Sequence, residues 1–291
     1  MIPFVKGHGL GNDYLVMQEA DLPGPLSTAA IVKICDRNWG VGSDGILLRV
    51  ATTRADFGLR IFNPDGSEAE KSGNGLRIFA KFLRDHGHIR RDVFTVDTPG
   101  GVVECQCQLK NGRVSFVTVE MGQATFRPAE IPMTHAGAEA VGVSLSLGTA
   151  GTVKATAVSV GNPHCVVFGD RLDDDETRRL GPLIENHRAF PNRTNVQFAR
   201  VLGRDAIEIR IWERGAGYTL ASGSSSCGAA SAAVKNGHCD HGRISVRMPG
   251  GELAVHVRPD FTLKLEGPVE ELCEGTLTAE FEETYVRGGG R

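Results

Sequence analysis

Two serines in this sequence stand where a helix is expected to begin, and the residues that flank them are similar. Ser72 and Ser222 are each followed by glycine and then by a helix-like run. The first backbone N–H groups of a helix have no acceptor within it and lie at the positive end of its dipole. Glycine lets an anion approach that backbone closely, so each serine marks a candidate carboxylate site. The alternative interpretation is that both serines are ordinary helix caps.

The match extends well beyond the serines. Residues 60–75 read RIFNPDGSEAEKSGNG, and residues 210–225 read RIWERGAGYTLASGSS. The same shift along the chain aligns three glycine-containing turns of the first half, at 11–12, 87–88 and 99–101, with three turns of the second half. Two long repeats in constant register favour two similar domains related by pseudo-twofold symmetry.

The pattern within each half predicts an α+β fold class. Short apolar runs bounded by Gly, Asn and Asp predict mainly antiparallel strands, and Asn111-Gly112 is a strong hairpin signal. Apolar or small residues at helical spacing predict one central helix in each half, over about 73–86 and 223–236. Smaller helices are expected over 27–37 and 173–186. We therefore expect two pseudo-symmetric domains, each of antiparallel strands wrapped around a central helix.

The domain boundaries follow from the repeat. We expect an N-terminal domain over 1–122 and a C-terminal domain over 123–275. The remaining segment, 276–291, ends in Gly-Gly-Gly-Arg and is expected to finish as a flexible tail.

Composition narrows the functional class. The 291 residues are 41% hydrophobic and 23% charged with a net charge of -3, so neither a nucleic-acid partner nor a membrane partner is expected. No signal peptide is visible at the start, which favours a cytoplasmic protein. The seven cysteines are an odd and scattered set, expected to be free thiols. No metal-ligand spacing and no cofactor motif is visible, so we expect neither.

Other polar residues occupy the duplicated turns. Glu213 and Arg214 lie in the same turn as Ser222, where a ligand role competes with that of a solvated surface pair. His164 stands beside a strand and is a candidate for either a catalytic or a structural role. Asparagine suits turns for its own reasons, but it also suits a polar, amino-acid-like ligand. The asparagines in such positions are Asn12, Asn63, Asn74, Asn162 and Asn195.

These segments together resemble one family. They are FVKGHGLGNDYLV, GVGSDG, NPDGSEAEKSGNGLRIFAKFL, GNPHCVVF, FPNRTNV and RIWERGAGYTLASG, and they span nearly the whole chain. The chain resembles diaminopimelate epimerase, within a wider group of amino-acid racemases and isomerases that need no pyridoxal phosphate. The resemblance implies two α+β domains with the site in the cleft between them, a role in lysine biosynthesis, and a possible homodimer.

The resemblance also assigns roles. Ser72 and Ser222 match the two cysteines that exchange protons with the substrate Cα on opposite faces. His164 and Glu213 match the residues that tune those thiols. Gly45 matches a position where some members use glutamine. The positions that match substrate contacts are Asn12, Asn63, Gly73, Asn74, Asn162, Asn195, Arg214, Gly223 and Ser224.

Serine at both cysteine positions is the main departure from the family. A serine hydroxyl is a much weaker acid than a thiol, so it needs a dedicated base. Three explanations of the serines are open. They are natural, and the protein catalyses a related isomerisation or binds its ligand without turnover; or they are natural, and another base such as Lys71, His164 or Glu213 accepts the proton. In the third, the serines were introduced by engineering to trap a substrate. The neighbouring GSSSC also departs from the family pattern, which favours natural divergence. Cys227 is expected to lie too far along its helix to replace the thiol.

The sequence thus predicts an isomerase of the epimerase or racemase type. It would act at Cα of a small amino acid or amino-dicarboxylate by two-base proton transfer. The alternatives are a fold-related isomerase or dehydratase acting on an unsaturated or hydroxy carboxylate, and a non-catalytic protein that binds an amino acid.

Overall fold

The computed structural model describes residues 1–287, so the expected flexible end of the chain, 288–291, lies outside the described residues. The chain divides into two compact units. The first unit contains Met1–Val119 and the chain from Gly267 onward, and the second contains Glu120–Glu266. No helix among residues 1–287 is long and apolar enough to cross a membrane.

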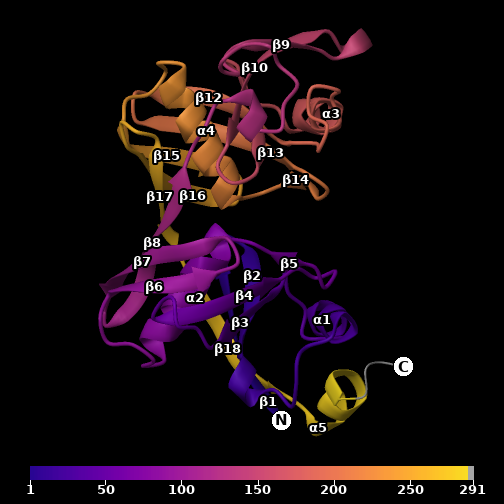
Figure 1. The fold of residues 1–291 in the computed structure, drawn as a ribbon, viewed down its shortest axis with the longest axis vertical. Helices are drawn as coiled ribbons and strands as arrows, with labels where there is room; N and C mark the ends of the chain where they lie inside the picture. The colour runs from indigo at the N-terminus through magenta and orange to yellow at the C-terminus, as the bar shows by residue number, and fades with distance from the viewer. Residues whose placement is uncertain (288–291) are drawn as a thin grey trace. The chain divides into compact units, whose positions relative to one another are not determined.

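The first unit is a curved, mostly antiparallel sheet (Figure 1). The β2–β3 and β4–β6 pairs are parallel and the other neighbours are antiparallel. The short strand β5 (Glu68–Ala69) pairs with β4. The strands follow one another across the sheet in the order β18 (Glu270–Leu277), β1 (Ile2–Gly9), β2 (Asn12–Gln18), β3 (Ile46–Val50), β4 (Phe57–Phe62), β6 (Val93–Thr98), β7 (Gly101–Lys110) and β8 (Arg113–Gln123).

The second unit repeats this arrangement. Again two pairs are parallel, β11–β12 and β13–β15, and a short strand, β14 (Gly217–Thr219), pairs beside the fifth strand. The order across the sheet is β9 (Val143–Ser146), β10 (Thr152–Ser159), β11 (Pro163–Phe168), β12 (Asn195–Gly203), β13 (Ala206–Glu213), β15 (Gly242–Met248), β16 (Gly251–Val257) and β17 (Thr262–Pro268). The predicted α+β class and the predicted duplication are both confirmed.

One central helix lies against the sheet of each unit: α2 (Gly73–Asp85) in the first and α4 (Gly223–Lys235) in the second (Figure 1). Both begin at the predicted glycine. Both are followed by a glycine with positive φ, 75° at Gly87 and 72° at Gly237, a conformation that costs glycine little. The residues of α4 are mostly Ala, Ser and Gly, which lets the surrounding strands approach the helix from several sides.

A second helix in each unit packs against strands of its sheet. These are α1 (Thr28–Cys35), capped by Ser27, and α3 (Asp174–Glu185), capped by Asp173. In the first unit the C-terminal segment, with α5 (Ala279–Phe281) and a π-helical turn over Glu282–Arg287, packs near α1.

The structure corrects the expected domain boundary. Residues 267–275 were expected in the C-terminal domain, but β18 pairs with β1 and therefore belongs to the first unit. The strand β18 was missed because its sequence, EELCEGTL, contains three glutamates and lacks the alternation of a half-buried strand. The strand β9 in the loop-like region after β8 was missed as well, since it is only four residues long.

Candidate active site

Ser72 caps α2 at the centre of the first cluster of candidate residues. Its Oγ accepts a hydrogen bond from Gly75 N at 3.0 Å, and its backbone is extended, as in an ordinary N-cap. The N–H groups of Gly73 and Asn74 precede the first intrahelical bond and are the ones that a bound anion can use. Tyr14 places its hydroxyl 3.5 Å from the Ser72 Oγ, a contact longer than a strong hydrogen bond.

A chain of side-chain hydrogen bonds ties this helix start to the β1–β2 hairpin. Asn74 is buried and donates from Nδ2 to Asn12 Oδ1 at 2.9 Å. Asn12 in turn donates to Asp44 Oδ2 at 2.9 Å. On the other side, Arg77 Nη2 donates to Asn74 Oδ1 at 2.9 Å. The structure therefore brings together two of the predicted asparagines and fixes which way their amides point.

Charged side chains also pair with one another at the same hairpin. Asp13 is buried, and burial alone would raise its pKa, but hydrogen bonds from Arg37 and Lys6 hold that pKa below its usual range. Arg37 Nη2 also bonds Asp44 Oδ1 at 2.8 Å. Two carboxylates and two cations are thus locked together around the turn, which leaves the amides of the turn in a defined position.

Two other positions that the resemblance assigns to the first cluster, Asn63 and Gly45, have different surroundings from those of Asn12 and Asn74. Asn63 lies in the turn between β4 and β5 and donates to Ser67 Oγ at 2.9 Å, a residue of its own turn. Gly45 has a φ of 154°, and a Cβ there would lie 2.3 Å from Phe62 O. The backbone at Gly45 therefore has no room for the glutamine that the resemblance associates with this position.

The second cluster is built around Ser222, the N-cap of α4. Ser222 is 6% exposed, and its Oγ accepts from Ser225 N at 3.4 Å. The N–H groups of Gly223 and Ser224 occupy the same positions as those of Gly73 and Asn74 in the first cluster. Cys227 is completely buried in α4, so it cannot offer a thiol to a ligand at this helix start.

His164 lies in β11 and is completely buried. Gln197, on the parallel strand β12, donates from Nε2 to His164 Nδ1 at 3.1 Å, so the ring proton lies on Nε2. That Nε2 donates to Asn162 Oδ1 at 2.9 Å. Burial, with a smaller effect from the positive charge of Arg214, lowers the pKa of His164 to about 3, although the Gln197 contact opposes this. The imidazole is therefore neutral, with both nitrogens engaged.

Gln197 connects this histidine to the helix start. Its Nε2 also lies 3.0 Å from the Oγ of Ser225, the residue whose N–H meets Ser222. A continuous path of contacts thus runs from His164 through Gln197 and Ser225 to Ser222, all of them buried.

Glu213 and Arg214 follow at the end of β13. Burial raises the pKa of Glu213, against a smaller lowering by a hydrogen bond from Thr219. The backbone N–H of Arg214 donates to Asn195 Oδ1 at 3.0 Å, while Asn195 Nδ2 holds Pro163 O at 2.9 Å. Asn195 therefore fixes the 213–214 turn relative to the strand that carries His164.

A buried carboxylate supports this turn from α3. Glu185 accepts from Gly215 N at 3.0 Å and from Arg193 Nη1 at 3.1 Å through one oxygen, and from Trp212 Nε1 at 2.7 Å through the other. Three donors on one carboxylate therefore fix the turn relative to the end of α3.

Comparison with known proteins supplies the family. The family model described as "Diaminopimelate epimerase" matches residues 4–127 and 156–271. A protein of Nostoc sp. named diaminopimelate epimerase 2 is 49% identical over 278 residues, covering 95% of this chain and 96% of that protein. The diaminopimelate epimerase of Pelotomaculum thermopropionicum is 42% identical over 279 residues, covering 94% of this chain and 97% of its own. This chain belongs to the diaminopimelate epimerase family.

A solved structure supports the fold of the family. The crystal structure of a probable proline racemase from Agrobacterium radiobacter has a TM-score of 0.72 at 15% identity, covering 96% of this chain and 93% of that one. At this identity the likeness concerns the two-domain α+β fold alone.

Family membership leaves the individual site residues to be judged by their geometry. Five predicted residues of the second cluster are joined by contacts: His164 with Asn162, Arg214 with Asn195, and Ser222 at the end of the path from His164. In the first cluster Asn12 and Asn74 are joined directly, next to Ser72 and Gly73 at the start of α2.

Several functional candidates were missed by sequence reasoning. Gln197 has a visible signal, a single polar residue inside the apolar strand VQFA. Asp44 and Tyr14 stand in motifs that carried the resemblance but were not singled out. Glu185 has no local signal, because it lies at the end of an ordinary amphipathic helix and finds its three partners only in the folded unit.

Proposed function

We propose that this protein is a diaminopimelate-epimerase-type isomerase that moves a proton at Cα of a small amino acid or amino-dicarboxylate without a cofactor. Membership of the family and the names of its relatives support the reaction class, and diaminopimelate is the first substrate to test. The observation that carries the proposal is the duplication of one arrangement, a capping serine at the first turn of a buried central helix, in both units.

In this proposal the helix starts bind the substrate carboxylate. The N–H groups at 73–74 and 223–224 lack intrahelical acceptors and lie at the positive end of the helix dipole, which favours an anion. The amides of Asn12, Asn74 and Asn162 would orient polar groups of the substrate. We propose Asn63, Asn195 and Arg214 as further substrate contacts.

The hydroxyls of Ser72 and Ser222 need a base, and Glu213 is the candidate that we favour. Its pKa is raised by burial, toward the range in which a carboxylate can accept a proton from a weak acid at neutral pH. His164 fits less well, because its only lone-pair nitrogen accepts from Gln197 and its pKa is lowered to about 3.

The test is solvent exchange at Cα. In D₂O, meso- and L,L-diaminopimelate should each take up deuterium at Cα above the uncatalysed rate, measured by proton NMR. We expect the exchange to be slow in this protein and to rise strongly in the double variant Ser72→Cys with Ser222→Cys, because a thiol is much the stronger acid. Ser231→Cys is the matched control, since it adds a thiol to α4 two turns away from the helix start.

Two outcomes would refute the proposal for this substrate. The first is a double cysteine variant that binds diaminopimelate but shows no exchange. The second is equal exchange in the control and in the double variant.

A second candidate function is binding without turnover, and the serines favour it because they keep the shape of the site without its acidity. Calorimetry that shows tight amino-acid binding by the unmodified protein, with no exchange for any bound ligand, would support this second function.

Three further expectations remain proposals. We propose a homodimer, which the family resemblance implies and which sedimentation equilibrium would test. We propose a cytoplasmic location, supported by seven free cysteines, six of them buried. We also propose that the protein has no nucleic-acid partner, in agreement with its net charge of -3.

A further inference from the structure

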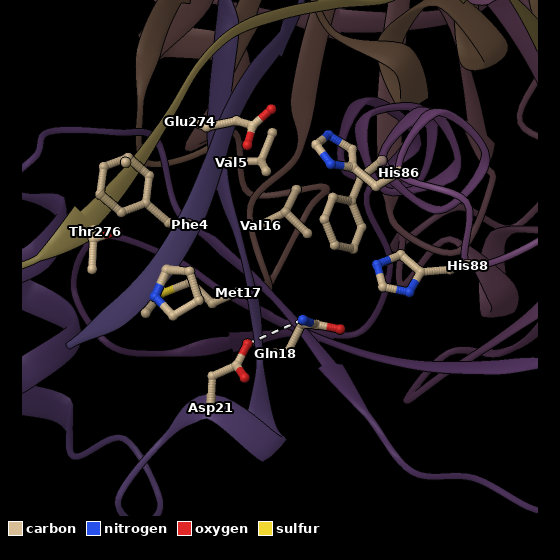
Figure 2. A pocket seen from close by; sticks show the side chains of 13 residues that line it. Phe4, Val5, Val16, Met17, Gln18, Asp21, His86, His88, Glu274 and Thr276 are labelled. Atoms are coloured by element: carbon tan, nitrogen blue, oxygen red, sulfur yellow. Dashed lines mark hydrogen bonds between the residues drawn. The ribbon is translucent and has the colours of Figure 1, made fainter.

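The first unit contains a cavity of about 440 Å³ that lies apart from the first cluster. It is formed by β1, β2, β18 and the end of α2 (Figure 2). Its wall includes the apolar side chains of Val5, Val16, Met17 and Phe82, and polar side chains stand around it. Lining residues of this cavity are not used by the proposed reaction, so the polar groups at its edge need their own explanation.

Three side chains that can bind a metal ion lie close together here: His86 and Glu274 line the cavity, and Glu271 contacts His86. One ligand atom from each lies within 4.8 Å of the others. His86 Nε2 and Glu271 Oε2 lie 3.0 Å apart. Figure 2 shows the imidazole of His86 and the carboxylate of Glu274 at the same end of the cavity, beside Val5.

A β-bulge explains why the two glutamates meet. In a regular strand, residues three apart point to opposite faces. Here Lys6 pairs with Cys273 and Gly7 pairs with Glu271, so Leu272 is an extra residue in β18. The extra residue brings Glu271 to the side of the strand where Glu274 lies. Such bulges re-aim side chains, and here the re-aimed side chain is a carboxylate directed at an imidazole.

The helix that carries His86 also favours a cation. His86 is the C-cap of α2, so it stands at the negative end of the helix dipole. Its ring packs on Phe82, with ring centroids 5.0 Å apart, and Phe82 packs on His88 at 4.9 Å. These contacts hold the imidazole in place. Two carboxylates, one imidazole and one helix C-terminus therefore share a small volume in which negative charge predominates.

We propose that His86, Glu271 and Glu274 form a binding site for a divalent transition-metal ion, with Zn²⁺ as the ion that best fits one nitrogen and two carboxylate ligands. Zinc–ligand distances of roughly 2.0–2.2 Å place neighbouring ligand atoms of a tetrahedral site about 3.3 Å apart. One pair is already at 3.0 Å, and the remaining atoms lie within 4.8 Å. Small side-chain rotations therefore close the site.

Three protein ligands leave a fourth position for water or an anion. The bound ion would join the end of α2 to β18, whose residues are 185 positions apart in the chain. Because α2 begins at Ser72, the ion would anchor the far end of the same helix.

The test is metal binding by the intact protein. Cys273 is the one exposed cysteine among the described residues, so Cys273→Ser serves as the parent to remove a competing thiol. Co²⁺ replaces Zn²⁺ as a spectroscopic probe, and its visible d–d absorption is titrated alongside equilibrium dialysis of Zn²⁺. Glu274→Gln removes a ligand, and Glu270→Gln is the matched control, because Glu270 lies on the same strand and is exposed.

We expect the parent to bind one ion per chain. Glu274→Gln should weaken binding by about tenfold or more, and Glu270→Gln by less than about twofold, because only the first removes a ligand. Zn²⁺ should raise the melting temperature of the parent and of Glu270→Gln, but not of Glu274→Gln. Equal affinity in Glu274→Gln and Glu270→Gln, or no binding by the parent at millimolar metal, would overturn the proposal.

Discussion

Acidification should weaken the second unit through one residue, His164. The imidazole is completely buried, and its pKa is lowered from 6.5 to about 3 mainly by that burial. The unfolded chain accepts a proton on this ring near its ordinary pKa, while the native protein does not until about pH 3. The stability that His164 contributes is therefore present above its unfolded pKa and is lost as the pH falls toward its folded pKa.

The magnitude follows from proton linkage. Each pKa unit corresponds to about 1.4 kcal/mol. A pH of 5 lies about 1.5 units below the pKa of the ring in the unfolded chain, while the native ring is still neutral. The free energy of unfolding should therefore be about 2 kcal/mol lower at pH 5 than at pH 7. At pH 3 the loss would be about 4 kcal/mol, in a range where many carboxylates titrate as well.

Urea unfolding followed by tryptophan fluorescence measures this loss. The chain has two tryptophans, and Trp39 is 74% exposed in the first unit. In a Trp39→Phe background the remaining Trp212 reports on the second unit, where it packs against the core and bonds Glu185. The free energy of unfolding is compared at pH 7 and pH 5 for this parent and for His164→Gln.

We expect the parent to lose about 2 kcal/mol more than His164→Gln over this pH change, whatever the two proteins differ by at pH 7. His241→Gln is the matched control, because His241 is an exposed histidine in the same unit. The reasoning is refuted if the parent and His164→Gln lose the same free energy, since His164 would then be protonated in the native state.

Two further predictions concern the same unit. Glu213 should show the opposite pH dependence: its pKa is raised mainly by burial, so the stability it contributes is present at low pH and lost as the pH rises through its folded pKa. Between pH 5 and pH 8 the free energy of unfolding of Glu213→Gln should therefore rise relative to that of the parent. A difference between the two proteins that stays constant with pH would contradict this. Gly228→Ala should lower the free energy of unfolding by about 1–3 kcal/mol despite the helix propensity of alanine, because its Cβ would lie 3.0 Å from the ring of His164. A rise in thermal midpoint would show that the ring moves freely.

Much of the fold is predicted by interactions between residues that are close in the sequence. Capping serines, helical spacing and glycine stops are chemistry between near neighbours, so α2 and α4 begin where the sequence predicts. The duplication is also visible without a structure, because it is a repeat of residue types at a fixed shift. The same signals locate Ser72 and Ser222, and the conformation of their helix starts needs no long-range contact.

What only the tertiary structure decides is which residues meet across strands. The pairing of β18 with β1 assigns the C-terminal strand to the first unit, although its charged sequence carries no sign of a partner. The amide of Gln197 sets the proton position of His164 because two parallel strands make them diagonal neighbours: His164 pairs with Asn195, and Gln197 lies two residues further along β12. Glu271 reaches His86 only through that strand pairing and its bulge. Such contacts depend on register, and register is set by the whole folded sheet rather than by neighbours along the chain.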